Sequence, residues 1–217
     1  MADIPPHIYR PPPIHKMGIV YHDPDLVVID KPSGLLSVPG RGDGKSICAS
    51  AYAEQVFGPV LTVHRLDMDT SGLMIFGRTK RAQAALSRQF EKRRIKKIYE
   101  AVIDGHPDQE SGLIDLPIAK YSVLRPLRHI EAGGQVALTR WRVLARSQTA
   151  SRVQLEPETG RSHQLRLHMA AIGHGILGDN FYGPAERTAR LMLHACGLAL
   201  FHPETNETLQ INSTAPF

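Results

Sequence analysis

Short apolar stretches separated by turn-forming residues recur along most of the 217-residue chain. At the start of this pattern, residues 18–22 and Leu26 to Ile29 flank the turn Asp23-Pro24-Asp25, which predicts two paired strands. Residues 31–46 are rich in Gly, Pro and Ser and predict a loop. The same reading predicts further strands at 72–79, 96–105, 190–202 and 207–215, and two strands around a polar turn within 137–159.

Three segments instead have helical spacing of their apolar residues. They are 47–58, which ends at Gly58, 80–94, with Ala84, Ala85, Leu86 and Phe90 on one side, and roughly 162–172, which Gly173 can end. Strands outnumber helices and many are joined by short turns. The expected fold is therefore α+β, with a mixed and mostly antiparallel central sheet flanked by helices and loops.

The domain organisation follows from the distribution of apolar residues. The polar, proline-rich residues 1–16 predict an extended lead on the surface, and residues 17–217 predict one domain. No apolar run is long enough for a transmembrane helix, and the start lacks the apolar core of a signal peptide. Cys48 and Cys196 stand far apart, without metal-binding spacing, so we expect buried thiols in a cytoplasmic protein.

Positive charge is concentrated in one segment. The net charge is +5, and residues 78–97 contain nine Lys or Arg against one acidic residue, Glu91. Such a focused cluster favours a polyanion such as nucleic acid, although a run of charge can also be a solvated helix face. Tyr99 follows this cluster closely, so its ring can either join the core or stack on an exposed base.

The stretch HRLDMDTSGL, residues 64–73, combines charged residues with a Thr-Ser-Gly turn at the end of a predicted strand. Polar residues at strand ends are well placed to face a cleft, but Asp and Ser also form turns without a catalytic role. Local chemistry therefore leaves Asp67 and Asp69 as alternatives for a reactive carboxylate.

A second candidate is ETGRSHQLRLHM, residues 158–169. On the predicted helix, His163 and Arg166 project from the same side, and Arg166 is either a surface residue or a buried cation that pairs with a carboxylate. His163, His168 and His174 are five and six residues apart, which does not fit a helical zinc motif. We therefore expect no metal site.

Taken together, these stretches resemble the RluA family of pseudouridine synthases. The core H-R-L-D-x-x-T-S-G-L with a later G-R-x-H-Q-L-R is highly specific, and the loop SGLLSVPGR is similar to that of the dual-specificity branch. The matching segments, in family order, are DKPSGLLSVPGRG, VHRLDMDTSGLMIFGRTKRAQAALSRQF, KKIYEAVIDG, ETGRSHQLRLHMAAIGHGILGDNFYG and RLMLHACGLAL. The resemblance implies the catalytic domain of that family, without an S4 RNA-binding domain and with an active-site cleft across the sheet.

The resemblance also implies an activity and a set of residues. Specific uridines in structured RNA, a tRNA anticodon stem-loop and a 23S rRNA loop, would be isomerised to pseudouridine without a cofactor. The aspartate directly after H-R-L, Asp67, would attack the sugar or the base or deprotonate the ribose, and Asp69 falls at a variable position. Arg166 would pair with Asp67 and keep it ionised, Tyr99 would stack on the flipped uracil and assist proton removal at C5, and Arg65 would fill the gap left by the base.

The remaining expectations concern binding. Leu193 would form part of the apolar wall of the pocket, and His64 either helps to distort the RNA or is a turn residue. Basic side chains would hold RNA phosphates without reading sequence. We expect a monomer with no membrane partner. A noncatalytic RNA-binding module of the same fold, or a metal-dependent hydrolase, are the alternatives. The expected RNA contacts are Arg78, Lys80, Arg88, Arg93, Lys96, Lys97 and Arg161.

Overall fold

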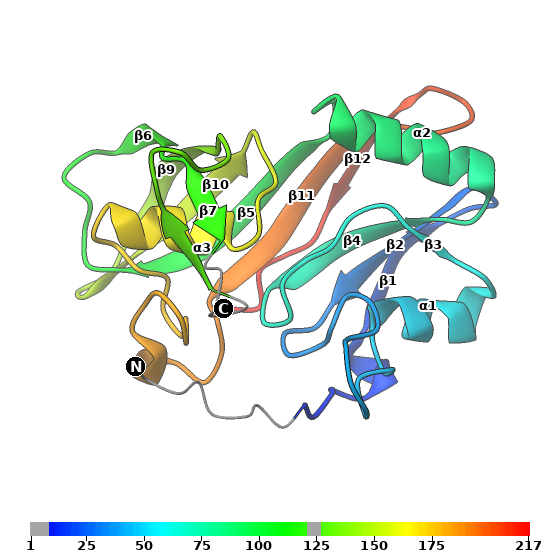
Figure 1. Cartoon of the computed structure of the whole chain (residues 1–217), viewed down its shortest axis with the longest axis horizontal. Coiled ribbons are helices and arrows are strands. Elements are labelled where there is room, and N and C mark those ends of the chain that lie inside the picture. Colours follow the sequence, from blue (N-terminus) through cyan, green and yellow to red (C-terminus); the bar gives the residue numbers. More distant parts are fainter. Residues whose placement is uncertain (1–8, 121–126) are drawn as a thin grey trace.

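A ten-stranded sheet runs through the protein, and a two-stranded sheet lies beside it in the computed structural model, which describes residues 9–120 and 127–217 (Figure 1). The strands are β1 Gly18–His22, β2 Leu26–Lys31, β3 Leu61–Thr62, β4 Ser71–Gly77, β5 Lys96–Asp104, β6 Ser111–Asp115, β7 Ile118–Lys120, β8 Arg128–Ile130, β9 Leu138–Arg146, β10 Ala150–Pro157, β11 Leu193–Phe201 and β12 Thr208–Asn212. The helices are α1 Ala49–Phe57, α2 Lys80–Glu91 and α3 Gln164–Ala171, with 3-10 turns at Ile14–Lys16 and Ala185–Arg187.

The main sheet has the order β1-β2-β4-β11-β5-β10-β9-β6, with β3 paired to β4 and β12 to β11. Its neighbours are antiparallel except for β4 and β11, which pair in parallel over two positions. The prediction of a mixed, mostly antiparallel α+β fold is confirmed. Strands β6, β7 and β8 were not predicted; β7 and β8 are only three residues long, and β6 contains a single buried residue, Ile114.

In one half of the sheet, β2 and β4 are buried on both faces. Helix α1 covers one face, where Ala49 and Ala53 pack, and α2 covers the other with Leu86. Alternate residues of each strand point to opposite faces, which explains why both strands are continuously apolar. The α1 side receives Val27, Ile29, Met74 and Phe76, and the α2 side receives Leu26, Val28, Leu73 and Ile75.

In the other half, α3 packs its Leu165 and Met169 against β5, β9 and β10. Strands β5 and β11 join the halves: Tyr99 of β5 packs against the cores on both sides, Leu193 belongs to one core and Ala195 to the other. The sheet is therefore continuous, and the gap between its helical covers lies over β5 and β11 (Figure 1).

Two predicted elements differ in detail. Helix α2 ends at Glu91, earlier than the predicted 94, and it buries Ala82 and Leu86 while Ala84 is exposed. The expected extended lead contains the 3-10 turn Ile14–Lys16, and residues 1–8 lie outside the described residues. Within the described residues, no helix combines the length and hydrophobicity needed to cross a membrane.

Candidate active site

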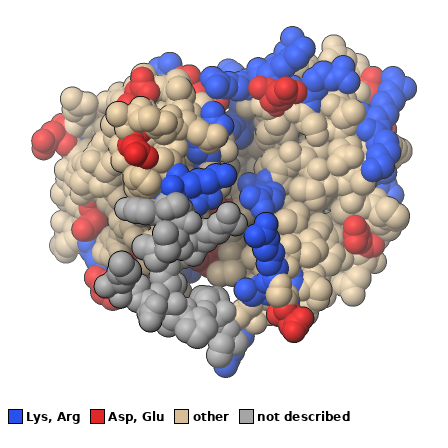
Figure 2. Space-filling model, in the orientation of Figure 1, with Lys and Arg blue, Asp and Glu red and all other residues tan. Residues whose placement is uncertain are grey.

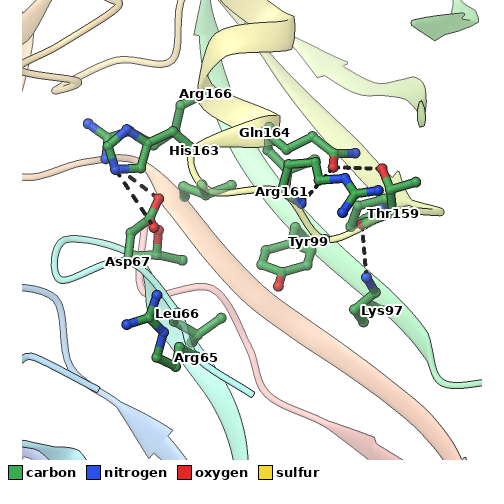
Figure 3. A pocket seen from close by; sticks show the side chains of 15 residues that line it. Arg65, Leu66, Asp67, Lys97, Tyr99, Thr159, Arg161, His163, Gln164 and Arg166 are labelled. Carbon is green, nitrogen blue, oxygen red and sulfur yellow. Dashed lines mark hydrogen bonds and ion pairs between the residues drawn. The ribbon is translucent and has the colours of Figure 1, made fainter. Parts of the chain in front are cut away.

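A cleft of about 100 Å³ opens where the two halves meet, above β5 and β11 (Figure 3). The loop before β4 forms one wall, and the segment from the end of β10 to the start of α3 forms the other. The lining residues are Arg65, Leu66, Asp67, Thr70, Lys97, Tyr99, Pro157, Thr159, Gly160, Arg161, His163, Gln164, Leu165, Arg166 and Leu193. The structure thus brings together residues that are up to 128 positions apart, from Arg65 to Leu193.

The loop that contains Asp67 is held by its backbone. Ser37 donates to the Leu66 carbonyl at 2.7 Å, and the Leu66 amide donates back to the Ser37 hydroxyl at 3.0 Å. Further along, Lys31 donates to the Met68 carbonyl at 2.9 Å, and Ser33 donates to the Asp69 carbonyl at 2.7 Å. The loop 31–37 therefore fixes the backbone on both sides of Asp67.

Gly72, the second residue of β4, has a backbone conformation that other residues rarely adopt, with φ at +114°. A Cβ added there would lie 2.4 Å from the Ala195 carbonyl oxygen, because β4 and β11 approach closely at this position. The prediction of a Thr-Ser-Gly turn is therefore wrong: the chain turns at residues 67–70, and Ser71 and Gly72 already belong to β4, where Gly72 allows the close contact with β11.

The structure places the two aspartates of the motif in different surroundings. The Asp67 side chain is 27% exposed and lines the cleft, with one carboxylate oxygen 3.6 Å from an Arg166 guanidinium nitrogen. Asp69 lies outside the cleft, where its carbonyl accepts the Ser33 hydrogen bond. Geometry therefore distinguishes two carboxylates that local sequence chemistry left as alternatives.

Arg166 has a stronger partner than Asp67. Its guanidinium donates two hydrogen bonds to the fully buried Asp179, at 2.6 and 2.8 Å, so Asp67 is a second and more distant neighbour. Burial opposes the charge of Arg166, but the hydrogen bonds and charge of Asp179 outweigh it and raise the pKa. Asp179 also accepts from the amides of Phe181 and Tyr182, so one carboxylate orders both the arginine and the following loop.

His163 is the other basic side chain that faces Asp67, at 3.9 Å. Burial lowers the pKa of His163 and outweighs the opposing charge of Asp67, so the ring is neutral near pH 7. One ring nitrogen lies 2.9 Å from the Tyr182 hydroxyl. The positive charge beside Asp67 therefore comes from Arg166.

Tyr99, labelled in Figure 3, lines the cleft from β5, and Leu193 lines it from the adjacent strand β11. Burial raises the pKa of Tyr99, and the negative charge of Asp67 adds to the effect, so the phenol stays protonated at neutral pH. Leu193 is almost fully buried and supplies an apolar surface. A flat apolar ring and a leucine beside a carboxylate suit a planar, uncharged ligand such as a nucleobase.

The opposite wall is braced by Gln164. Its carbonyl accepts from the Thr159 hydroxyl and the Arg161 amide, at 2.7 and 3.0 Å, and its amide donates to the Leu138 carbonyl. Lys97 donates to the Thr159 carbonyl at 3.0 Å. Burial lowers the pKa of Lys97 to about 8, and the nearby charge of Arg93 contributes.

His64, although in the motif, lies beneath the surface rather than in the cleft. Its Nε2 accepts from the Ile75 amide at 3.0 Å, and its ring stacks on Phe90 of α2 at 4.6 Å. Burial lowers its pKa to about 3, with a smaller contribution from Lys97, so the imidazole is neutral. These contacts give His64 a place in the packing of α2 against the sheet.

Figure 2 shows Lys and Arg side chains on both sides of the hollow and along the upper and right-hand edges. Arg78 differs from the exposed residues of this group, because it donates to the carbonyls of Asp23 and Phe57. Arg161 donates a side-chain hydrogen bond to the Val136 carbonyl. Four of the expected phosphate contacts, Lys80, Arg88, Arg93 and Lys96, are exposed, and so is Arg65.

The histidines considered for a metal have separate partners. His168 contacts the Thr139 hydroxyl and the Leu116 carbonyl, His174 contacts the Asp104 carbonyl, and His163 contacts Tyr182. A different group, Asp23, Asp25 and His202, places its ligand atoms within 4.8 Å of one another. Asp23 there accepts hydrogen bonds from Tyr21, His202 and two backbone amides, which accounts for the cluster as a braced turn.

Two residues of the site were missed in the sequence. Asp179 follows a glycine and reads as a turn former, and its pairing with Arg166 depends on how a loop folds over α3. Lys31 is the last residue of β2 and is fully buried, with hydrogen bonds to the carbonyls of Pro32, Leu35 and Met68. Its place two residues after the apolar run Leu26 to Ile29 was the available signal, since a lysine enters the core only when its amine is bonded.

We expect Lys31 to make stability depend on pH. Burial lowers the pKa of Lys31 to about 7, although the charges of Asp69 and Asp67 oppose the shift. Between pH 7 and the ordinary pKa of 10.5, the unfolded chain binds a proton that the folded protein has released, so the free energy of unfolding rises with pH. Urea unfolding from about pH 6 to about pH 10 should show that the free energy of unfolding of wild type increases relative to that of Lys31→Met as pH rises. A constant or shrinking difference would contradict the assignment.

Comparison with known proteins agrees with this geometry. A family model described as RNA pseudouridylate synthase matches residues 25–171. The chain is 45% identical to the dual-specificity RNA pseudouridine synthase RluA of Pasteurella multocida and 41% identical to that of Escherichia coli, covering 96% of this chain and 98% of each relative. The solved structure of human RNA pseudouridylate synthase domain containing 1 superposes with a TM-score of 0.82 at 29% identity, over 96% of this chain and 87% of that one. The chain belongs to the RNA pseudouridylate synthase family.

Proposed function

We propose that this protein isomerises specific uridines to pseudouridine in two structured RNAs, a tRNA anticodon stem-loop and a loop of 23S rRNA. The observation that carries the proposal is the Asp67 carboxylate, held in a cleft beside the Arg166 cation and next to Tyr99. The RluA relatives described above are named dual-specificity enzymes, which supports two RNA targets. We propose a monomer that works in the cytoplasm, where both RNAs are made.

The reaction needs access to atoms that a folded RNA hides. The N1–C1′ bond breaks, the uracil turns, C5 bonds to C1′ and loses its proton, and N1 takes up a proton. Neither C1′ nor the base edge is reachable within a helix, so the uridine must leave the stack. Arg65 is exposed at the mouth of the cleft. Its planar guanidinium suits the gap left by the uracil.

Each of the main side chains in the cleft can be assigned a role in this reaction. The Asp67 carboxylate starts the reaction, at the sugar or the base or by taking a ribose proton, and Arg166 keeps a positive charge against it. Tyr99, as a protonated phenol, provides a stacking face for the uracil, and Leu193 supplies an apolar wall. Proton removal at C5 by Tyr99 would first require loss of its own proton, so the stacking role is favoured.

The two proposed targets can be tested in cells. Pseudouridine is mapped across total RNA from cells with and without the gene, and from cells that carry the Asp67→Asn form. We expect one anticodon stem-loop site and one 23S rRNA site to disappear in both altered strains. Loss at only one RNA would remove the dual specificity, and loss at neither would refute the proposed targets.

The phosphate contacts make a separate prediction. Lys96→Ala should weaken RNA binding equally for different sequences and reduce the slope of log affinity against log salt by about 1, because one released counterion is lost. Arg146→Ala is the matched control, since that arginine is already paired with Glu110 at 2.7 Å. Fluorescence titrations at several salt concentrations give both slopes. An unchanged slope for Lys96→Ala would remove this residue from the RNA interface.

A further inference from the structure

Phe181 presents a partly exposed aromatic ring that contacts two residues of the cleft wall. It lies in the loop between α3 and β11 and remains 36% exposed. Its neighbours His163 and Arg166 both line the cleft and both face Asp67. The ring is therefore one side chain removed from the Asp67 carboxylate, and its exposed part is available to an RNA that places a uridine in the cleft.

The surrounding residues hold this ring in place. Its amide donates to the buried Asp179 carboxylate at 2.9 Å. The ring stacks with His163 at 5.6 Å and an interplanar angle of 21°, lies 5.0 Å from the Arg166 guanidinium carbon, and meets Tyr182 edge-on at 6.1 Å. A ring fixed in this way loses little conformational entropy when a ligand covers its exposed part.

The chemistry of the position favours a nucleobase. Exposed Arg and Lys side chains lie on both sides of the hollow, so this face of the protein attracts a polyanion. Once phosphates are held there, an exposed aromatic ring binds unpaired bases by stacking, without regard to their identity. Loops of structured RNA contain such bases, and proteins read them by stacking on aromatic side chains.

We propose that Phe181 is a second stacking site for RNA, which takes an unpaired base of the substrate loop while Tyr99 takes the target uridine. This inference rests on the proposed function, because it assigns the ring to the same RNA. It adds a contact that holds the loop open beside the flipped nucleotide and so contributes to the choice of substrate. The competing role for the ring is a cover that shields the pair between Arg166 and Asp179 from water.

Two substitutions distinguish these roles. Phe181→Leu keeps an apolar cover and removes the aromatic face, whereas Phe181→Tyr keeps the face. With a tRNA anticodon stem-loop that has a pyrimidine-rich loop, Phe181→Leu should weaken binding and raise KM by about 5- to 100-fold, and Phe181→Tyr should restore both. In both variants the rate at saturating RNA should stay within about twofold of wild type, and the pH dependence of this rate should be unchanged, since Asp67 and Arg166 are unaltered.

The partner base is found by removing bases one at a time. Stem-loops with an abasic nucleotide at each loop position are titrated with wild type and with Phe181→Leu. At one loop position, removing the base should weaken binding by wild type as much as Phe181→Leu weakens binding of the intact RNA. Phe181→Leu should bind that abasic RNA no more weakly than it binds the intact RNA, because the same stacking contact is already lost. This measurement needs no turnover, so it tests the stacking site separately from the proposed function.

Phe201→Leu is the matched control, because this residue is 41% exposed at the end of β11 and is not among the residues that line the cleft or contact His163 or Arg166. It should bind the stem-loops as wild type does. Equal affinities for wild type and Phe181→Leu, or penalties that add at every loop position, would overturn the inference. A lower saturating rate or an altered pH profile with unchanged affinity would also overturn it and assign the ring to the cover. Failure of wild type to form pseudouridine would refute the proposed function alone.

Discussion

Asp67→Asn should lower the rate of pseudouridine formation roughly 1,000-fold or more and leave RNA affinity within a few fold. Asparagine has nearly the same shape but can neither attack carbon nor take a proton as a carboxylate does. The backbone clamps on Leu66 and Met68 do not involve the Asp67 side chain, so the loop should keep its position. The rate is measured under single-turnover conditions by digesting the RNA and separating the nucleosides.

Asp69→Asn is the matched control, two residues away in the same loop. Its carboxylate lies outside the cleft, so the rate should stay within about tenfold of wild type. If Asp67→Asn kept its activity while Asp69→Asn lost it, the assignment of the reactive carboxylate would be reversed. Normal RNA binding by both variants is needed to exclude a general loss of structure.

Asp179→Ala should destabilise the protein by about 3–5 kcal/mol, because it leaves the buried Arg166 charge without its partner. The Arg166 side chain is 3% exposed and donates two hydrogen bonds to Asp179. Activity at saturating RNA should fall with stability, since Arg166 then loses the contacts that hold it beside Asp67. Urea unfolding gives the first quantity, and single-turnover rates at a temperature where the variant is folded give the second.

An exposed ion pair provides the comparison. Glu110 pairs with Arg146 at 2.7 Å and its side chain is 76% exposed, so Glu110→Ala should cost less than about 1 kcal/mol and leave the rate unchanged. Equal and small effects of the two substitutions would contradict a structural and positioning role for Asp179. If Asp179→Ala were destabilised but kept a normal rate, Asp179 would have a structural role and no role in positioning Arg166.

The order of strands and helices followed from the sequence where periodicity is strong. The continuous apolar runs of β2 and β4 predicted buried strands, and α1 and α3 were predicted close to their observed bounds. The three short strands β6, β7 and β8 carry too few residues for a clear alternation. The parallel contact of β4 with β11 joins residues more than 120 positions apart, and no local pattern predicts such a pairing.

For the site, resemblance to a family gave the candidate residues, and physical chemistry explains how the fold arranges them. Asp67 and Asp69 are equivalent in local sequence terms and differ only because Lys31, Ser33 and Ser37 clamp the intervening backbone. Arg166 was expected to pair with Asp67, but its strongest partner is Asp179, across a loop contact that forms only in the folded chain. Tertiary contacts of this kind lie beyond sequence periodicity.

The central claim is that this chain makes pseudouridine, and tritium release from RNA tests it most directly. Transcripts of tRNA and 23S rRNA are labelled with tritium at C5 of uridine and incubated with the purified wild-type protein. Because C5 exchanges its hydrogen for a bond to C1′, we predict tritium release that stops once the target uridines are converted, and none above background with Asp67→Asn. Binding of the same transcripts without any release of tritium would contradict the account and leave a noncatalytic RNA-binding protein.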